Sequence, residues 1–294
     1  MKILNFGSLN LDYTYRLDHF VRPGETEASF SRTIACGGKG LNQSIALAKC
    51  GAPVIHAGAV GKSDGLILID TLNNAGVDTS LILRLEDVPS GSAFIQVVPS
   101  GENAIVLDGG ANQAIHEAYA EEVLSHFEEG DWLLLQNEIS CIPWIMRKAH
   151  DIGMNIVLNP SPMNASVFQM PLEMVDLFIA NEHEASRLSS HAQNTAAELQ
   201  RRYPTAAALI TLGGAGSMYI QDGKTISQDA FRVDAVDTTG AGDTFTGFFL
   251  GSLVKGEDVQ ESMRIAAAAA ALSVTKKGAS DSIPTLSEVL AYLS

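Results

Sequence analysis

The second half of the chain alternates regularly between helix-like and strand-like segments. Helical patterns cover 117–127, 143–151 and 195–202, and short apolar runs cover 132–136, 155–158, 177–180 and 208–212. Strands separated by helices normally pair in parallel, with the helices packed on both faces of the sheet. This order therefore predicts an α/β fold with a mostly parallel central sheet. A chain of 294 residues is long enough for one such domain with a smaller piece attached.

The first half adds a second kind of structure. A strand at 2–7, a helix at 41–50, a strand at 54–60 and a helix at 64–74 extend the alternating pattern, but strand-like runs at 13–17, 30–35, 92–98 and 103–107 have no helices between them. The turn Pro99-Ser100-Gly101-Glu102 is typical of a β-hairpin. We therefore expect a large α/β domain at 1–12, 37–90 and 110–294, and a small β element at 13–36 and 91–109.

The composition excludes some classes of partner. The chain is 46% apolar and 18% charged, which is typical of a soluble globular protein. Its net charge of −15 argues against nucleic acid and against an anionic membrane surface. The N-terminal apolar run is too short for a signal peptide, and no run has the length of a membrane span. Three widely separated cysteines, Cys36, Cys50 and Cys141, are expected to be reduced thiols of a cytoplasmic protein.

Residues 233–251 combine a glycine-rich turn with an apolar helix. A β-type run at 231–236 leads into Gly240-Ala241-Gly242, and Asp243 then opens an apolar segment at 245–254. The free N–H groups and the positive dipole end of a helix start can bind an anion. Asp243 fits two roles at this position, a simple N-cap or a catalytic base. The local sequence does not decide between them.

Other polar residues also follow predicted strands or begin predicted helices. Together with Asp243, these candidates are Asn10, Asp12, Gly38, Lys39, Asn42 and Glu138. The carboxyl ends of parallel strands meet at one edge of a sheet, so these side chains could line one cleft. Asn10 and Asp12 also fit a simple polar turn.

These motifs resemble those of the ribokinase (PfkB) family of carbohydrate kinases over nearly the whole chain. The most specific match is Val236-Asp237-Thr238-Thr239-Gly240-Ala241-Gly242-Asp243-Thr244-Phe245, and the second is Gly37-Gly38-Lys39-Gly40-Leu41-Asn42-Gln43. Shorter agreements lie at 7–12, 23–26, 135–138, 211–213 and 275–279, and at Asn181 with Glu184. The resemblance implies a ribokinase-like three-layer αβα fold in which the small β element is a lid over the sugar.

The resemblance also implies an activity, the ATP-dependent phosphorylation of the primary hydroxyl of D-ribose to give ribose 5-phosphate. Asp243 would be the base, and the turn Gly240-Ala241-Gly242 with the Asp243 N–H would hold the transferring phosphate. The sugar would be bound by Asn10, Asp12, Gly38, Lys39, Asn42, Glu138 and Asp243. These residue types suit the task, because phosphoryl transfer needs positioning and charge stabilisation more than covalent help.

The remaining implied ligands are ATP and two cations. ATP would be bound by Asn181, Thr211, Gly213 and Gly242, with Glu184 acting on Mg²⁺ through water. An activating monovalent cation, K⁺, would be held by Asp237, Thr239, Ser273, Lys276, Gly278 and Ser282, several of them through backbone carbonyls. The resemblance also implies a homodimer formed through the β lid.

The chain departs from the family pattern at a few positions. Ala267 stands where ribokinase-like sequences often have Asn near the nucleotide, and Cys36 replaces a frequent Pro. Tyr13 and Tyr15 are bulkier than expected beside the sugar. Three alternatives remain at this point: a related kinase for another furanose or a nucleoside, a catalytically silent sugar-binding regulator, and a dinucleotide-binding oxidoreductase. The last is disfavoured because no Gly-x-Gly-x-x-Gly follows the first strand.

Overall fold

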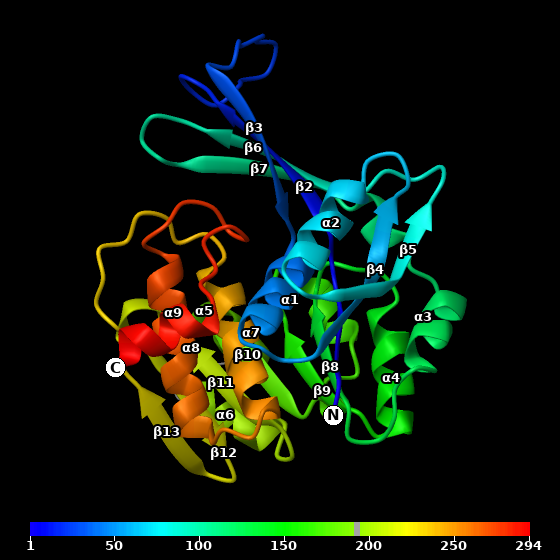
Figure 1. Cartoon of the computed structure of the whole chain (residues 1–294), viewed down its shortest axis with the longest axis vertical. Coiled ribbons are helices and arrows are strands. Elements are labelled where there is room, and N and C mark those ends of the chain that lie inside the picture. The colour runs from blue at the N-terminus through cyan, green and yellow to red at the C-terminus, as the bar shows by residue number, and fades with distance from the viewer. Residues whose placement is uncertain (191–194) are drawn as a thin grey trace.

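The chain folds around one large sheet with helices on both faces (Figure 1). A computed structural model describes residues 1–190 and 195–294. The sheet has nine strands in the order β13 (Lys224–Gln228), β12 (Ser217–Gln221), β11 (Ala207–Thr211), β10 (Leu177–Asn181), β9 (Asn155–Asn159), β8 (Trp132–Gln136), β1 (Ile3–Phe6), β4 (Val54–Gly61) and β5 (Asp78–Leu85). Among the described strands of this sheet, only β12 and β13 pair in antiparallel fashion, so the predicted mostly parallel sheet is confirmed.

The two faces of this sheet bury separate cores. One core lies under α3 (Glu117–Leu124), α4 (Ile142–Ile152), α5 (Glu182–Ser189) and α6 (Thr195–Arg202). The other lies under α1 (Lys39–Lys49), α2 (Leu66–Asn74), α7 (Ala241–Val254), α8 (Val259–Ser273) and α9 (Leu286–Leu293). Strand β1 serves both cores, because Leu4 and Phe6 point to the first while Ile3 points to the second. No helix in the described residues has the length and apolarity needed to cross a membrane.

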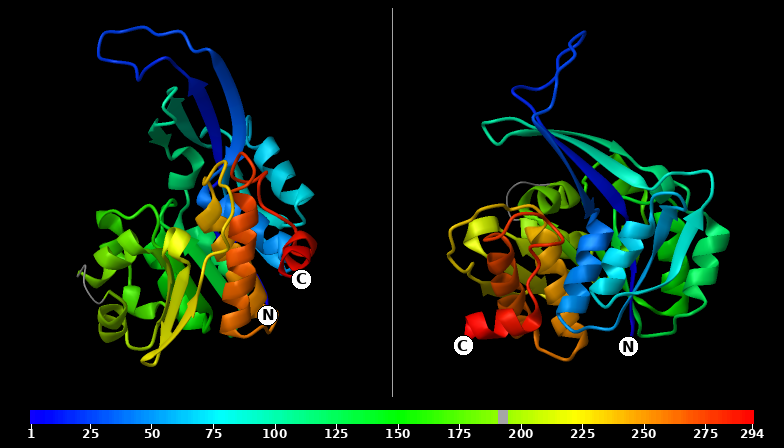
Figure 2. Two further views of the ribbon diagram at one scale, coloured as in Figure 1. Left: turned by 90° about the vertical axis from the view of Figure 1, so that its left-hand side faces the viewer. Right: turned by 45° about the horizontal axis from the view of Figure 1, so that its top comes forward.

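A second sheet of four strands stands over one edge of the large sheet (Figures 1 and 2). Its order is β3 (Ser31–Gly37), β2 (Asn10–Arg16), β6 (Gly91–Val97) and β7 (Asn103–Asp108). The hairpin pairs are antiparallel, whereas β2 and β6 pair in parallel. The four-stranded element predicted from the sequence is therefore present. The exact division of the chain into domains stays a prediction, since β2 and β3 run past the limits expected at 13 and 36.

The segment that leads into α7 is not a strand, so the prediction of a strand at 231–236 is wrong. The backbone N–H groups of Val236 and Asp237 both donate to the carbonyl of Val274, at 2.7 and 3.1 Å. This carbonyl follows the end of α8, so the segment is tied to a helix end instead of to a sheet. Helix α7 begins at Ala241, four residues before the expected position. The strands β5, β12 and β13 and the helices α5 and α9 were not predicted from the sequence.

Candidate active site

Helix α7 begins in a glycine turn that leaves its first N–H groups available. Gly240 is the N-cap, with a φ of 75° in the left-handed region, and a Cβ there would stand 3.0 Å from the Cβ of Ala279. Glycine is therefore required at residue 240. In the described chain, no side chain caps this helix start. The N–H of Ala241 makes a long 3.3 Å bond to the carbonyl of Thr238, while those of Gly242 and Asp243 lie in the first turn, where no intrahelical acceptor exists. This turn is suited to an anion.

Asp243 is a buried carboxylate and not an N-cap, so the capping interpretation is wrong. Its side chain lies in the first turn of α7, and the residue is only 7% exposed. Asn42 donates from Nδ2 to Oδ2 at 3.1 Å, and Gln43 donates from Nε2 to Oδ1 at 2.9 Å. Each carboxylate oxygen thus has one amide donor from α1, which fixes the orientation of the group. Among the described residues, the buried Oδ1 of Asn42 has no hydrogen-bond partner.

Lys39 places a cation among three carboxylates. It opens α1 after Gly38, which has a φ of 94° and lies against the backbone of Ser8. The negative charge of Asp243 raises the pKa of Lys39; burial opposes this shift, and Glu138 and Glu184 add to it. The ammonium group therefore stays charged at physiological pH.

Glu138 connects the end of β8 to the start of α1. Its Oε2 accepts hydrogen bonds from the hydroxyl of Ser8 and from the backbone N–H of Lys39, the latter at 2.9 Å. Asp12 lies nearby on β2, close enough to Gly37 that a Cβ there would stand 2.1 Å from its Oδ2. Burial, and after it repulsion from Glu138, raises the pKa of Asp12 to about 6. The protonation state of Asp12 therefore depends on its burial and on the charge of Glu138.

Asn10 also lies on strand β2, so the polar-turn interpretation of Asn10 and Asp12 is wrong. Its Oδ1 accepts from Nδ2 of Asn112 at 2.7 Å, and Oδ1 of Asn112 accepts from the N–H of Leu9 at 3.0 Å. Gly91 leaves the room for this pair, because a Cβ there would overlap both amides. Asn112 thus fixes the orientation of Asn10.

Two adjoining cavities open along this edge of the sheet. The larger, of about 610 Å³, is mainly apolar and lies between the end of β11 and helices α7 and α8; its walls include Thr211, Gly213, Gly214, Phe231, Val233, Gly242, Phe245, Ala267, Ala270, Ala271 and Val274. The smaller, of about 120 Å³, is lined by Lys39, Asn159, Ser161, Ile179, Ala180, Asn181, Glu184, Thr211, Gly240, Gly242, Asp243 and Thr246. Thr211 and Gly242 border both. An apolar chamber therefore opens beside a polar one that contains the helix start and Lys39.

Comparison with known proteins identifies the family. The model of the pfkB family carbohydrate kinases matches residues 1–286. The chain belongs to this family. As a pfkB-family kinase it is a phosphotransferase that acts on an alcohol group. It is 36% identical to the ribokinase of Haemophilus influenzae, over 98% of this chain and 96% of the relative.

Solved structures agree with this assignment. The ribokinase of Arabidopsis thaliana, complexed with ribose and ATP, superposes with a TM-score of 0.87 at 29% identity, covering 100% of this chain and 98% of that chain. The ribokinase of Cryptococcus neoformans var. grubii, in complex with ADP, gives a TM-score of 0.86 at 31% identity and 99% coverage of both chains. The predicted family and the ribokinase-like αβα fold are therefore confirmed.

In this pfkB-family kinase, two residues predicted to act at the nucleotide site also stabilise the start of a helix. Asn181 and Glu184 form a capping box at the start of α5, in which Oδ1 of Asn181 accepts from the N–H of Glu184 at 2.9 Å and Oε2 of Glu184 accepts from the N–H of Asn181 at 3.0 Å. Both residues nevertheless line the smaller cavity. The capping box holds the Glu184 carboxylate at the cavity wall.

The residues predicted to bind a monovalent cation are only partly brought together by their side chains. Asp237 accepts from the N–H and the hydroxyl of Thr239 at 3.0 and 2.7 Å, and from the N–H of Gly278 at 3.0 Å. Burial acts to raise the pKa of Asp237, but the hydrogen bonds from Thr239 and Gly278 outweigh it, so this pKa lies below its usual value. Lys276 turns its ammonium to Glu288 at 3.3 Å.

The serines predicted for the same site turn their hydroxyls to nearby carbonyls. Ser273 donates to the carbonyl of Ala270 at 2.8 Å, and Ser282 donates to that of Ala279 at 2.9 Å. A donating hydroxyl keeps its lone pairs, so Ser273 and Ser282 could contribute hydroxyl or backbone oxygens to a cation site, whereas Lys276 could contribute only its backbone oxygen.

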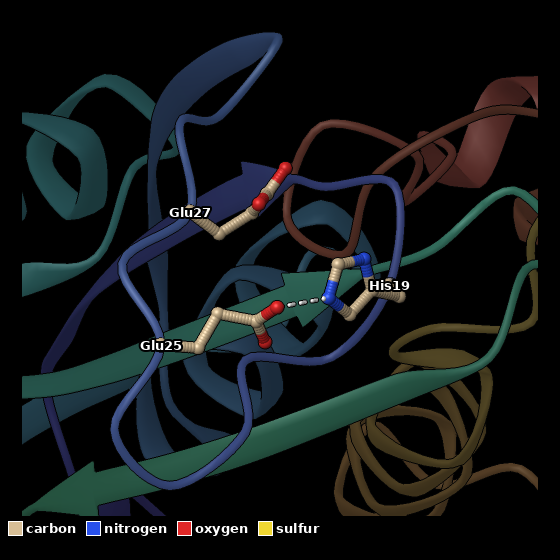
Figure 3. A group of neighbouring side chains, drawn as sticks. All are labelled: His19, Glu25 and Glu27. Carbon is tan, nitrogen blue, oxygen red and sulfur yellow. Dashed lines mark hydrogen bonds and ion pairs between the residues drawn. The ribbon is translucent and has the colours of Figure 1, made fainter.

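A separate cluster of one histidine and two glutamates lies in the loop between β2 and β3. Within the part of the chain that the structure describes, His19, Glu25 and Glu27 are the one group of possible metal ligands, with ligand atoms within 4.8 Å of one another (Figure 3). His19 and Glu25 already form an exposed ion pair of 3.0 Å, and the hydrogen bond that His19 donates to Glu25 raises the pKa of His19. This ion pair already uses two of the three possible ligands.

Several polar residues of the site were not identified from the sequence. These are Ser8, Gln43, Asn112, Gln136 and Asn159, all of them buried. Gln43 is the last residue of the second family motif, Gln136 ends a predicted strand and Asn159 directly follows one, so their positions carried a signal. Their contacts cross long sequence separations, and only the folded structure reveals them.

Proposed function

We propose that this kinase transfers the γ-phosphate of ATP to the primary hydroxyl of D-ribose and releases ribose 5-phosphate and ADP. One observation carries the proposal. The Asp243 carboxylate, the start of its own helix and Lys39 line the smaller polar cavity, which adjoins the apolar chamber at Thr211 and Gly242. The named relatives support ribose as the acceptor, since they are ribokinases and one of them was solved with ribose and ATP.

The proposed reaction uses Asp243 as the general base. An alcohol is a poor nucleophile, and a carboxylate within hydrogen-bond reach removes its proton as the oxygen attacks. A bond forms between the hydroxyl oxygen and the γ-phosphorus, the bond to the bridging oxygen of ADP breaks, and the proton passes to Asp243. The N–H groups of Gly242 and Asp243 lie where negative charge develops on the phosphoryl group. The N–H of Ala241 would join them by giving up its long bond to Thr238.

The sugar would occupy the space between β2 and the start of α1. The unpaired Oδ1 of Asn42 is an acceptor for a sugar hydroxyl, and burying it without a partner is otherwise unfavourable. The carboxylates of Asp12 and Glu138 are further acceptors, and Lys39 is a donor. We assign sugar binding to these residues together with Asn10 and Gly38, whose backbone approaches Ser8 closely.

The nucleotide would fill the apolar chamber. Its volume of about 610 Å³ suits a planar base with its ribose, and the small side chains of Ala267, Ala270 and Ala271 let a flat ring approach α8. The phosphates would then pass Thr211, Gly213 and Gly242 toward the smaller cavity, where Asn181 also lies. Because Ala267 carries no amide, this wall holds the base by burial instead of by a hydrogen bond.

The donor groups present fit the expected cations. Glu184 uses Oε2 in its capping box, which leaves its Oε1 for a water bound to Mg²⁺. When bound, Mg²⁺ would neutralise charge on the phosphates. Asp237 and Thr239, which are joined by hydrogen bonds, would supply side-chain oxygens for K⁺, and Ser273, Lys276, Gly278 and Ser282 would complete an all-oxygen set that suits this ion.

The assembly and location are part of the same proposal. The small sheet exposes several large apolar side chains, which are Ile34, Phe94, Ile105, Val106 and Leu107, and Phe30 directly before β3 is exposed as well. Apolar groups gathered on one element favour a protein partner, and we propose a homodimer formed through this sheet. The three cysteines are free thiols, which supports a cytoplasmic protein.

A phosphorylation screen tests the function. The purified protein would be given ATP and Mg²⁺, with and without K⁺, and ribose, deoxyribose, fructose or several nucleosides as acceptors. We expect the highest kcat/KM with ribose and faster turnover with K⁺. Preferred turnover of another acceptor would replace ribose as the substrate. Tight sugar binding with no turnover of any acceptor would instead support a sugar-binding regulator.

A further inference from the structure

The Asp243 carboxylate is anchored by a residue that no substrate can touch. Gln43 is fully buried, and its Nε2 donates to Oδ1 of Asp243 at 2.9 Å and to Oδ1 of Asn159 at 3.2 Å. A carboxylate only accepts hydrogen bonds, so the amide of Gln43 must present its nitrogen to Asp243 and its oxygen to the opposite side. The orientation of Gln43 is therefore determined by its contacts.

Gln136, at the end of β8, holds Gln43 in that orientation. Its Nε2 donates to Oε1 of Gln43 at 2.7 Å and to Oδ1 of Asn5 at 2.9 Å. Asn5 in turn donates from Nδ2 to the carbonyl of Gly40 and to the hydroxyl of Ser44, both at 2.8 Å. Each amide in this series of hydrogen bonds has only one orientation that satisfies its neighbours, so the series has a single arrangement.

The other arm of these hydrogen bonds reaches a buried histidine. The hydroxyl of Ser44, which accepts from Asn5, also lies 2.8 Å from Nδ1 of His56. Burial lowers the pKa of the fully buried His56 to about 3, so its ring is neutral and Nδ1 can accept a hydrogen bond from Ser44. Two arms of hydrogen bonds thus start at the amide of Gln136, and they end at His56 and at Asp243.

We infer that Gln136 is a positioning residue for catalysis, which acts through Gln43 to hold the Asp243 carboxylate in line with the acceptor hydroxyl. Gln136 is 1% exposed and contacts neither the cavities nor Asp243. These hydrogen bonds connect the first turn of α7 to the central strands of the sheet, so the Asp243 carboxylate cannot rotate independently of those strands. The inference rests on the proposed role of Asp243 as the base.

The first test replaces the amide of Gln136 by an alkyl group of similar size. Gln136→Met leaves Oε1 of Gln43 without its donor and frees that amide to turn. We expect kcat to fall by about tenfold to a hundredfold, because small misplacements of a reacting group have effects of this size. The KM for ribose should stay nearly unchanged, since the sugar contacts are intact. A wild-type kcat, or a change confined to KM, would refute the inference.

A matched control separates positioning from general stability. Asn155 lies at the opposite end of the neighbouring strand β9 and donates from Nδ2 to the carbonyl of Gly130 at 3.0 Å. Asn155→Leu makes the same kind of amide-to-alkyl change and should destabilise the fold while leaving kcat at the wild-type value. An equal loss of kcat in both variants would mean that Gln136 acts only through stability.

A double-mutant cycle tests whether Gln136 acts through Gln43. Gln43→Met should lower kcat at least as much as Gln136→Met, and the double variant should be no slower than Gln43→Met alone. If the two losses of kcat multiply in the double variant, the two residues act independently, which would contradict the proposed series of hydrogen bonds. If Gln136→Met does not fold, Gln136→Asn takes its place, because its shorter amide cannot reach Gln43.

Asp243→Asn, assayed in parallel, tests the underlying function separately. Wild-type turnover in Asp243→Asn would show that Asp243 is not the general base. A loss in Asp243→Asn together with wild-type turnover in Gln136→Met would overturn only the positioning chain.

Discussion

Gly247 on α7 lies directly against Ala46 on α1. A Cβ added at residue 247 would stand 2.4 Å from the Cβ of Ala46 and 2.9 Å from the carbonyl oxygen of Gln43. Asp243 lies one helical turn before Gly247, and Gly251 lies one turn after it. Gly251 also packs against the end of α1. The glycines therefore allow the two helices to approach closely, and this approach brings Asp243 within reach of its amide donors.

Gly247→Ala should lower both stability and activity. Alanine gains about 1 kcal/mol of helix propensity over glycine, but overpacking of this kind typically costs about 1–3 kcal/mol. We expect a lower free energy of unfolding in urea and a reduced kcat, because α7 must move away from α1. Gly251→Ala is the graded control, since its Cβ would meet Cys50 at 3.1 Å, and it should have the smaller effect. A Gly247→Ala protein with wild-type stability and kcat would show that the close packing is unimportant.

Asp243→Asn should abolish most turnover while leaving sugar binding largely intact. The amide keeps the size of the side chain but cannot take a proton from the acceptor hydroxyl, so kcat should fall by about two orders of magnitude or more. Steady-state kinetics gives kcat, and calorimetric titration with ribose gives the affinity. A parallel loss of sugar affinity would indicate that Asp243 mainly binds the substrate.

Much of this site could be predicted from sequence because its residues lie at strand ends and helix starts. The alternation of strands and helices predicted the parallel sheet, and that sheet brings Lys39, Glu138 and Asp243 to one edge. The glycine turn at Gly240 was recognisable because a left-handed residue before an apolar helix requires glycine.

The contacts that orient these residues could not be predicted in the same way. The bond from Gln43 to Asp243 joins residues 200 positions apart, and local sequence contains no record of such a pairing. The supposed strand at 231–236 failed for a related reason. Its alternating pattern suits a sheet edge, yet the N–H of Val236, at the end of this segment, donates to the carbonyl of Val274 instead of to a strand. Sequence patterns thus locate the polar residues, whereas tertiary packing determines their hydrogen-bond partners.

Ala270→Phe should weaken ATP binding selectively. Ala270 is half-buried in the wall of the larger cavity on α8, so a phenyl ring would extend into the space assigned to the base. We expect the KM for ATP to rise by about tenfold or more, in keeping with the loss of a buried aromatic contact, and the KM for ribose to change little. Ala270→Ser adds one atom and serves as the control. Equal changes in both KM values would place the nucleotide elsewhere or indicate a general distortion.

Sugar affinity should depend on pH through Asp12. Its pKa of about 6 in the free protein means that acidification protonates an acceptor assigned to the sugar. The KM for ribose should therefore rise as pH falls below about 6, and Asp12→Asn should have a high KM with a weaker dependence on pH. Initial rates between pH 5 and 8, with the stability of each protein checked at each pH, provide the measurement. An unchanged KM for ribose across this range would remove Asp12 from the sugar site.

The same carboxyl group should make the unliganded protein less stable as pH rises. Asp12 has a usual pKa of 3.8 and a folded-state pKa of about 6, so between these values the folded protein retains a proton that the unfolded chain has lost. Stability from this group is therefore fully present below pH 4 and is lost as pH rises through 6. Asp12→Asn should be more stable than the wild type by about 1–3 kcal/mol at pH 8, and the difference should shrink at pH 4. Urea unfolding of both proteins at the two pH values measures that difference, in which the contributions of other titrating groups cancel. A difference that does not depend on pH would show that burial of Asp12 does not disfavour its charge.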